Sequence, residues 1–431
     1  MAENKINLGG VHMGTHIDGA QQGKPLQDTP FHTLVISPFC GNHDNCKPSP
    51  QMVDKDNFDE VIAKFSPELS LSLNQDSQIK LRFQSLDDFH PDALYQQVAL
   101  FSQLKQLRNR LNNQNSFAEA AREMGAYTTE PAPQAVAETE TTGMDAASVL
   151  DMTLNTTDAQ ISEQQNPDNL AKNLIQDIIA PYIIPAPDPK KDELVNSVDQ
   201  SISALMNSIL HHPDFQKLEA SWRALYLLIS RSETDSKLKV FIYHTRKADV
   251  LRDFSESEIT DSRFYKTLLE PYSQTPGGIP WSSIVLDFEI TASPLDVLLL
   301  DIMSQLAASS NACLLAQGSN GYVGIDSLSE TPDSDDWGKH YAPDFTTAWD
   351  NLRTQSYAQY LGLCYPRFLL RIPYGQNTRP IESFNYEEME NNEHNDLLWG
   401  NSAYAIALLL NQAYSKAGWS LKPGQERDVT R

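Results

Sequence analysis

The sequence lacks long apolar runs, a secretory leader and a cysteine framework. None of the apolar stretches in its 431 residues approaches the ~20 residues that a bilayer-spanning helix needs, which predicts that the chain is not an integral membrane protein. The first ten residues, MAENKINLGG, have neither the charged start nor the apolar core of a secretory signal. The four cysteines are too few for a disulfide framework in so long a chain, so we expect a reducing, cytoplasmic compartment.

Positive charge is also scarce. Lys and Arg together number 33 against 57 for Asp and Glu, which gives a formal net charge of −24 at pH 7. Such acidity argues against the phosphate backbone of nucleic acids and against anionic lipid surfaces as partners. The hydrophobic fraction of 40% is ample for packed cores, so wholesale disorder is excluded as well.

One stretch is poor in both bases and aromatic residues. Residues 116–169 contain ten acidic side chains and a single base, Arg122, and no Phe, Tyr or Trp occurs between Thr128 and Asn169. A segment of this kind cannot bury enough apolar surface to offset its chain entropy. We therefore predict an acidic, disordered linker that separates an N-terminal module, residues 1–115, from a larger part, residues 170–431.

The N-terminal module carries the pattern of a small α/β fold. Residues 31–36 read as a buried strand, and residues 78–83 alternate between apolar and polar as a half-buried strand does. A short helix is predicted over residues 58–65, between the two strands. A longer amphipathic helix is predicted over residues 91–111.

The larger part begins with helical patterns and continues as an α/β layer. After an apolar-rich helix at residues 170–184, the stripes at 194–209 and 215–229 predict an antiparallel helical pair. The strands predicted beyond this pair cover residues 238–244, 284–288, 312–316 and 367–372, and the helices cover residues 247–254, 263–272, 294–309 and 397–414. This alternation indicates a mixed sheet with helices on both faces.

Catalytic and cofactor-binding motifs are missing. No phosphate-binding pattern GxxxxGK[ST] or GxGxxG follows a predicted strand, and neither GxSxG nor HExxH occurs. Because nothing in the chain assembles a nucleophile, a base and an oxyanion donor, we expect no enzyme and no cofactor. A remote alternative, an uncharacterised hydrolase, would depend on His211, His212 or Cys313.

Two clusters have residue types that bind metal ions. Cys40, His43 and Cys46 place three such side chains within seven residues, but a structural zinc site normally has a fourth ligand and no second cluster of this kind occurs. Two free thiols in a turn are therefore favoured, and no metal site is predicted. The acidic run at 387–394 is interpreted as a solvated loop.

Four stretches of the larger part resemble motifs of the large subunit of the type VI secretion contractile sheath, in the same order. They are His211–Arg223 (HHPDFQKLEASWR), Pro366–Gly375 (PRFLLRIPYG), Phe384–Glu388 (FNYEE) and Leu398–Ala405 (LWGNSAYA). Within them, Phe215, Trp222, Arg223 and Trp399 are the candidate core positions of the family motif. Trp222 and Trp399 are expected on apolar helical faces, and we expect Trp222→Ala to impair folding or assembly.

The N-terminal module is similar to the small sheath subunit. The resemblance rests on Asp56–Glu60 (DNFDE), Leu81–Pro91 (LRFQSLDDFHP) and Leu104–Arg108 (LKQLR), with Pro38–Gly41 (PFCG) as a partial match. The chain therefore reads as a small-subunit-like module fused to a large-subunit-like one. The linker is long enough for the first module to pair with its own C-terminal part or with that of a neighbour.

The resemblance implies a mechanical role. In such systems, small and large subunits interlock by strand exchange into a tube around an inner tube, and contraction of the sheath drives the inner tube outward. Its implied partners are other copies and types of sheath subunit, the inner-tube protein, the sheath-disassembly ATPase and the baseplate, in the bacterial cytoplasm. The matching ATPase-recognition helix would present Leu174, Ile175, Ile178 and Ile179, unless that helix merely packs on its own domain.

The match to the family stops before the end of the large subunit. That subunit continues for a further domain beyond the segment that matches Gly418-Trp419, whereas this sequence stops at Arg431. Residues 170–431 are thus expected to lack the C-terminal domain of the family, as a fragment or as a shortened paralogue. The leading hypothesis is a contractile sheath subunit; the alternative is a non-polymerising adaptor or a baseplate-associated paralogue.

Overall fold

The computed structural model describes residues 7–8, 11–12, 28–42, 46, 49–72, 78–113, 116–124, 191–338, 341–389 and 394–423. The chain divides into two compact units, and each gathers segments that are far apart in the sequence. Unit 1 comprises Met1–Pro67, Leu218–Leu370 and Trp399–Arg431, and unit 2 comprises Glu68–Lys217 and Arg371–Leu398.

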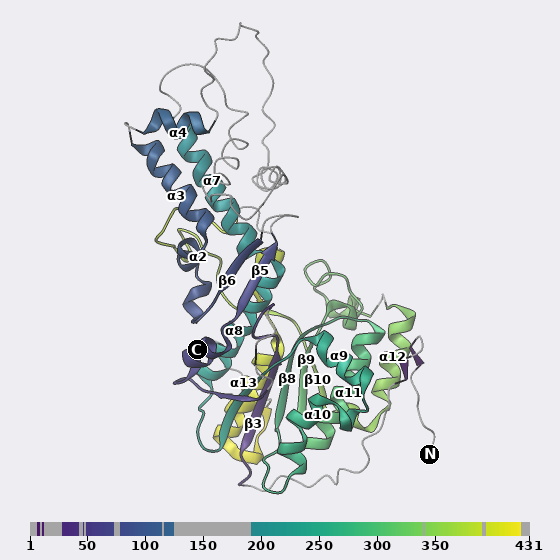
Figure 1. Ribbon diagram of the computed structural model, residues 1–431. Helices are drawn as coiled ribbons and strands as arrows, with labels where there is room; N and C mark the ends of the chain where they lie inside the picture. The colour runs from purple at the N-terminus through teal and green to yellow at the C-terminus, as the bar shows by residue number, and fades with distance from the viewer. Residues whose placement is uncertain are drawn as a thin grey trace. The chain divides into compact units, whose positions relative to one another are not determined.

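A six-stranded sheet forms the centre of unit 1 (Figure 1). Its strands, in spatial order, are β10 (Leu361–Cys364), β9 (Cys313–Gly318), β8 (Ser283–Ile290), β3 (Phe31–Ser37), β7 (Leu238–His244) and β4 (Gln51–Val53). Neighbouring strands are parallel except for β4, which runs antiparallel to β7 at one edge. The sheet is therefore mixed, as predicted.

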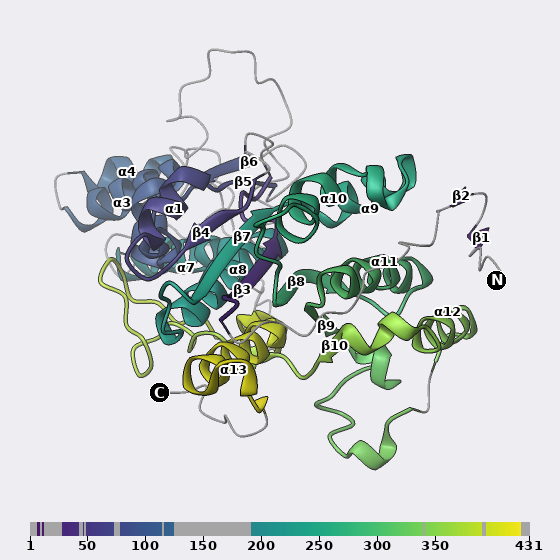
Figure 2. The ribbon, with the colours of Figure 1, turned by 90° about the horizontal axis from the view of Figure 1, so that it is seen from below.

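Helices cover both faces of this sheet, which confirms the expected α/β class (Figure 2). On one face lie α9 (Lys247–Glu256), α10 (Arg263–Leu268) and α11 (Pro294–Ser310), and on the other lie α8 (Pro213–Arg231) and α13 (Ser402–Ala417). The remaining helices of unit 1 are α1 (Phe58–Phe65) and α12 (Pro343–Arg353), and α12 packs against α11.

Local sequence explains where the central helices of unit 1 begin. Pro294 occupies the first turn of α11, and the hydroxyl of the preceding Ser293 accepts the main-chain N–H of Asp296. The side chain of Asn401 caps α13 in the same way, by accepting the N–H of Ala403 at 2.9 Å. A capping side chain satisfies one of the main-chain donors that a helix start leaves without a partner.

Unit 2 combines a hairpin with helices. Strands β5 (Glu68–Ser72) and β6 (Gln78–Arg82) pair antiparallel and precede α2 (Pro91–Gln97), α3 (Ala99–Asn112) and α4 (Phe117–Glu123). Helix α7 (Lys191–Leu210) packs against α3, and Arg108 of α3 donates two hydrogen bonds to the carboxylate of Asp199 on α7. The predicted antiparallel partner of α7 was the next helix in sequence; within unit 2 it is α3 instead.

Short elements complete the described structure. They are the strands β1 (Asn7–Leu8), β2 (Val11–His12), β11 (Phe368–Leu369) and β12 (Trp399–Gly400), and the short helical turns at Leu86–Phe89, Ile259–Asp261, Glu270–Gln274, Asn320–Val323, Ser334–Asp336, Ser356–Tyr360, His394–Asp396 and Gly418–Ser420. Among the helices that the structure describes, none has the length and apolar character needed to cross a membrane.

Several predicted segments differ from the structure. The predicted disordered linker begins too early, because Phe117–Glu123 form α4, which packs against α3. The helix expected over 91–111 is two helices, because Val98 between them adopts an extended backbone with φ −85° and ψ 117°. The strand expected over 367–372 is reduced to β11. The helix expected over 397–414 starts only at Ser402, because residues 399–400 form β12, which pairs with β11. Trp399 thus lies in a short strand and not on a helical face.

Candidate functional site

The N-terminal segment supplies the middle of the sheet in unit 1. Strand β3 pairs along its whole length with β7, from Phe31 opposite Leu238 to Ser37 opposite His244, and also pairs with β8 on its other side. All seven residues of β3 are buried. The strand therefore joins the N-terminal segment to the C-terminal part of this same chain, and this junction is our candidate functional site.

The two faces of β3 differ in their packing: one packs on the apolar core, and the other carries two hydroxyl side chains next to Phe31 and Val35. Leu34 and Ile36 are part of the apolar core that includes Val250, Phe264 and Leu300 of helices α9–α11. Residues 33 and 37, a threonine and a serine, lie on the face covered by α13 and α8. A central strand normally carries apolar residues on both faces, so the hydroxyl side chains of Thr33 and Ser37 are the distinctive feature of β3.

A chain of buried hydrogen bonds connects Thr33 of β3 to α13 and to β8. The Thr33 hydroxyl donates to Asn411 Oδ1 of α13 at 2.8 Å and accepts from the Ser283 hydroxyl of β8 at 2.9 Å. Asn411 in turn donates to the Ser232 hydroxyl at 3.0 Å. Asn411 is fully buried, so these bonds satisfy polar atoms that would otherwise be costly to bury.

A second group of hydrogen bonds converges on the carboxylate of Asp287 in β8. Its Oδ2 accepts hydrogen bonds from the hydroxyls of Ser37 on β3, Ser221 on α8 and Tyr404 on α13, at 2.9, 2.7 and 2.9 Å. Its Oδ1 accepts from Asn401 Nδ2 at 3.0 Å. Burial and the neighbouring carboxylate raise the pKa of Tyr404, which keeps its hydroxyl a donor. One carboxylate thus holds three elements onto β3.

The turn after β3 is anchored by Trp222. Its ring is fully buried and lies 4.9 Å from the ring of Phe39, and its Nε1 donates to the Phe39 carbonyl oxygen at 3.0 Å. Phe58 and Phe65 of α1 contact the same ring, both at centroid distances of 6.0 Å. The predicted burial of Trp222 on α8 agrees with this placement, and its main partners come from the N-terminal segment.

Unit 2 holds a buried charge cluster. Arg371 donates two parallel hydrogen bonds to Glu388, at 2.7 and 2.9 Å, and the main-chain N–H of Tyr374 donates a third at 2.7 Å. His211 Nε2 lies 3.7 Å from Glu388 Oε1, and His211 Nδ1 lies 3.4 Å from Asp396 Oδ1. Burial would raise the pKa of Glu388, but the nearby His211 and the hydrogen bonds from Arg371 outweigh it and lower that pKa to about 2.

These contacts join residues from different sequence motifs. His211, Arg371 and Glu388 come from three different motifs, and unit 2 brings them into one cluster. In unit 1, Ser221 of the first motif and Tyr404 of the fourth share the carboxylate of Asp287. Sequence reasoning identified the motifs but not Asp287, which lies in a predicted strand without any motif around it.

The other predicted motif residues lie apart from this junction. Phe215 is fully buried and contacts the rings of Phe83 and Phe89 in unit 2. Arg223 pairs with the buried Glu219 at 2.6 Å, one turn before it on α8. Trp399 is half-buried under the guanidinium of Arg367, at 5.4 Å from the ring centroid. The predicted ATPase-recognition residues, Leu174, Ile175, Ile178 and Ile179, lie outside the described residues.

The side chains on which a hydrolase would depend do not form a catalytic group. Cys313 lies on β9 in unit 1, where burial raises the pKa of its thiol and disfavours the reactive thiolate. His211 and His212 lie in unit 2, the former within the charge cluster, while Nδ1 of the latter accepts the main-chain N–H of Asp214 at 3.2 Å.

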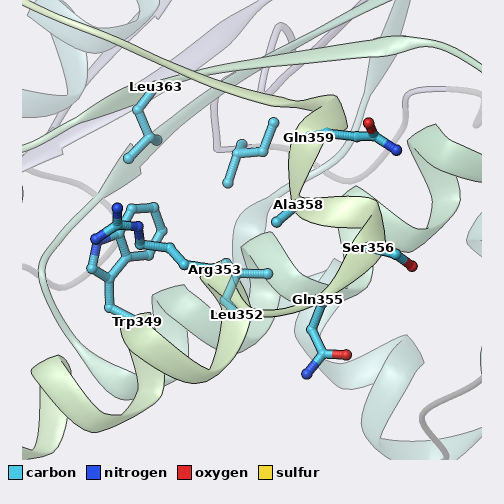
Figure 3. Close-up of a pocket in the computed structure, with 9 residues that line it drawn as sticks. Trp349, Leu352, Arg353, Gln355, Ser356, Ala358, Gln359 and Leu363 are labelled. Carbon is cyan, nitrogen blue, oxygen red and sulfur yellow. The ribbon is translucent and has the colours of Figure 1, made fainter.

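A pocket of about 470 Å³ lies between α12, the turn at Ser356–Tyr360 and the edge strand β10 (Figure 3). Its lining is mostly apolar or amide, and Arg353 is its single charged residue. Ser356 is the only hydroxyl among the lining residues, and none of them is a histidine, cysteine or carboxylate that could activate it. The pocket lacks the side chains of an active site.

The two cysteines of the sequence cluster are not free thiols. Cys40, at the carboxyl end of β3, forms a disulfide with Cys46, and their Cα atoms are 6.5 Å apart. The expectation of two free thiols was wrong because it weighed the cysteines only against a zinc site. Spacing alone could not reveal that Cys46 lies against Cys40.

Comparisons with known proteins agree with the motifs. Residues 192–423 match the family model VipB, described as "EvpB/VC_A0108, tail sheath N-terminal domain". Residues 11–126 match a model described as "Type VI secretion system, VipA, VC_A0107 or Hcp2". The type VI secretion system sheath protein TssC1 of Pseudomonas aeruginosa is 33% identical over 232 residues, which are 53% of this chain and 47% of that protein. The chain thus spans about half the length of this curated relative.

Proposed function

We propose, from the premise that this chain belongs to the VipB tail sheath family, that it is a structural subunit of a type VI secretion sheath. Its N-terminal part is VipA-like, so we propose that it supplies both subunit types in one polypeptide. The role needs no catalytic residue, since a sheath stores energy in the packing of its subunits. We place it in the bacterial cytoplasm, where such a sheath assembles.

The insertion of β3 carries this proposal. A strand from the VipA-like segment lies between two strands of the VipB-like part and is buried along its length. Two modules joined through the centre of a sheet form one inseparable building block, as an interlocked sheath subunit must. The polar contacts of Thr33 and Ser37 add specificity, because another strand in this position would leave buried partners unsatisfied.

The finer assignments extend the same proposal. We propose a small-subunit-like module at 1–115, a connector at 116–169 and a large-subunit-like part at 170–431; the family matches, at 11–126 and 192–423, support this order of the modules but extend the first one beyond residue 115. The subunit would assemble with other sheath subunits around an inner-tube protein on a baseplate and contract by repacking. A disassembly ATPase would then recognise the segment that contains Leu174, Ile175, Ile178 and Ile179.

Electron microscopy of the purified full-length chain tests the polymer. We expect tubules, or incorporation of the chain into tubules when the inner-tube protein and partner sheath subunits from the same bacterium are co-expressed. Copies that remain monomeric with all of these components would overturn the sheath assignment. Copies that bind at one end of a tubule without extending it would instead identify an adaptor or baseplate-associated paralogue.

The ATPase assignment has a separate test. Replacing Ile175 and Ile178 by Asp removes apolar side chains from the expected recognition face, and we expect capture by the immobilised disassembly ATPase to be lost. Replacing the neighbouring polar residues Asn173 and Gln176 by Ser is the matched control and should leave capture intact. Unchanged capture of the Asp variant would exclude this face as the recognition element.

A further inference from the structure

We propose that Cys40, Cys46 and His244 form a zinc-binding site that is open when the Cys40–Cys46 disulfide is reduced and closed when it is oxidised. One atom from each side chain that is able to ligate a metal lies within 4.8 Å of the other two. The site is independent of the proposed role in a sheath, because it depends on side chains within a single unit of a single chain.

Sheet topology brings the third ligand to the two cysteines. Strands β3 and β7 are parallel and in register, with Ser37 opposite His244, so both strands end at the same edge of the sheet. Cys40 follows β3 by three residues, and His244 is the last residue of β7. The sequence cluster lacked this ligand because His244 lies about 200 residues away from it.

The surroundings hold the turn and the imidazole against each other. The main-chain N–H of Cys40 donates to His244 Nδ1 at 3.2 Å, so the ring is turned toward the cysteine turn. Phe39, next to Cys40, is fixed by the bond from Trp222 Nε1 to its carbonyl oxygen. Cys40 is fully buried, while Cys46 and His244 are half-buried, so a metal ion has access from one side.

The donor set suits zinc. Two thiolates and one imidazole, with a water as fourth ligand, form one of the tetrahedral arrangements that zinc adopts in proteins. At a Zn–S distance of ~2.3 Å, tetrahedral geometry separates two sulfur atoms by about 3.8 Å. Cα atoms 6.5 Å apart allow both this separation and the disulfide, so the change needs only a small movement of the turn.

The redox step balances with a thiol reductant. Two low-molecular-weight thiols, or one dithiol, transfer two electrons and two protons to the disulfide, which becomes two cysteine thiols while the reductant forms its own disulfide. Zinc then binds the two sulfur atoms and the imidazole, and the two thiol protons are released to solvent. In the reverse direction, a low-molecular-weight disulfide accepts two electrons from the two cysteine sulfur atoms and two protons from solvent and leaves as two thiols, while the Cys40–Cys46 disulfide forms and zinc is released.

The test is a zinc titration of the full-length chain in two redox states, without oxygen, against a chromophoric chelator. The reduced protein is expected to bind one equivalent of zinc and the oxidised protein none at the same site. Cobalt bound in place of zinc should give a sulfur-to-cobalt charge-transfer band in the reduced protein only. Because the two samples have the same sequence, this comparison does not depend on the folding of a variant.

Variants identify the ligands. We expect Cys46→Ser and His244→Gln each to raise the zinc dissociation constant roughly tenfold or more, since each removes one of three protein ligands. Cys313→Ser, at the cysteine on β9, is the matched control and should bind like the wild type. Far-ultraviolet circular dichroism checks that each variant is folded. Equal zinc affinity of the reduced wild type and Cys46→Ser, or of the wild type and His244→Gln, would overturn the site.

Discussion

Two titratable side chains are buried in this protein in opposite ways. Glu388 is 2% exposed and is paired with Arg371, whose guanidinium also lies 4.4 Å from the ring of Tyr374. His32 is 5% exposed between the rings of Phe241 and Trp281, and neither of its ring nitrogens has a hydrogen-bond partner in the described structure. The first is stabilised as a charged group and the second as a neutral one.

The Glu388→Gln variant should be strongly destabilised. The exchange removes the negative charge that compensates the buried Arg371, which costs about 3–5 kcal/mol when one partner of a buried pair is lost. Urea unfolding followed by circular dichroism measures the change. Glu387→Gln, at the exposed neighbour, should change the free energy of unfolding by less than about 0.5 kcal/mol. Similar unfolding midpoints for the two variants would contradict this account of Glu388.

The lowered pKa of His32 should make the stability of the protein depend on pH. Burial, with a smaller effect of the charge on Lys239, lowers the pKa of His32 from 6.5 to about 4, so the folded state holds this ring neutral. The stabilisation is complete above pH 6.5 and is lost as the pH falls from 6.5 toward 4, where the unfolded chain binds the proton more strongly. Glu388 contributes in a lower window, because its pKa falls from 4.5 to about 2.

His32→Phe should therefore reduce the dependence of the thermal unfolding midpoint on pH between pH 6.5 and 4. The measurement is differential scanning fluorimetry at a series of pH values, with His394→Gln, at an exposed histidine, as the control that retains the wild-type slope. A wild-type slope in the His32→Phe variant would mean that another group titrates in this window.

At the scale of elements, polar and apolar contacts have different effects on β3 and α8. The four buried apolar residues of β3 supply apolar area, while the hydroxyls of Thr33 and Ser37 connect the strand to α13 and α8. Helix α8 adds the aromatic anchor Trp222. The helix is therefore expected to stabilise the turn after β3, and the polar contacts to fix which strand occupies the sheet centre.

Thr33→Val should destabilise the packing of β3, although valine has nearly the same shape as threonine. The exchange removes the hydroxyl that joins Asn411 to Ser283 and leaves a buried amide oxygen without this donor, at a cost of about 1–3 kcal/mol. Chemical unfolding measures the loss. Thr347→Val, at an exposed position of α12, is the matched control and should be close to neutral. A neutral Thr33→Val would show that the hydroxyl contributes little to holding the strand.

Trp222→Ala should be more damaging than Thr33→Val. The ring is fully buried among Phe39, Phe58 and Phe65, and truncation of a buried tryptophan costs about 3–5 kcal/mol. We expect a lower thermal unfolding midpoint and a smaller yield of soluble protein. Tyr226→Ala, one turn later on α8 and 41% exposed, serves as the control. Soluble Trp222→Ala with a wild-type midpoint would contradict the core placement.

At the scale of the whole molecule, sequence order and spatial order differ. Unit 1 contains both the first strand of the large sheet and its last helix, and unit 2 contains residues 68–217 together with 371–398. The N-terminal segment is therefore attached to the C-terminal part by the sheet as well as by the chain.

Cleavage of the connector tests this attachment. A protease site placed between residues 124 and 191 should yield two fragments that elute together in size-exclusion chromatography, because β3 remains paired with β7 and β8. Val35→Pro, in the middle of β3, removes a main-chain donor inside the sheet and should lower the urea concentration at which the fragments separate, although α3 of the first fragment still packs against α7 of the second. Separation of the wild-type fragments in native buffer would mean that covalent linkage alone holds β3 in place.

Local patterns determined much of this protein. The alternation or helical spacing of apolar residues identified β3, β7, β8 and α11 as elements, because burial of one face imposes a period on the sequence. The order of the four motifs indicated the type VI sheath family before any contact was known. A capping asparagine also marks the true start of α13, which the apolar pattern placed too early.

The tertiary structure decided which distant residues meet. Strand partners depend on how the whole sheet closes, so a buried strand at residues 31–36 carried no sign that β7 and β8 would flank it. For the same reason, the cluster of His211, Arg371 and Glu388 and the approach of His244 to Cys40 follow from long-range packing. Periodicity records whether a side chain is buried, whereas its partner is set by elements hundreds of residues away.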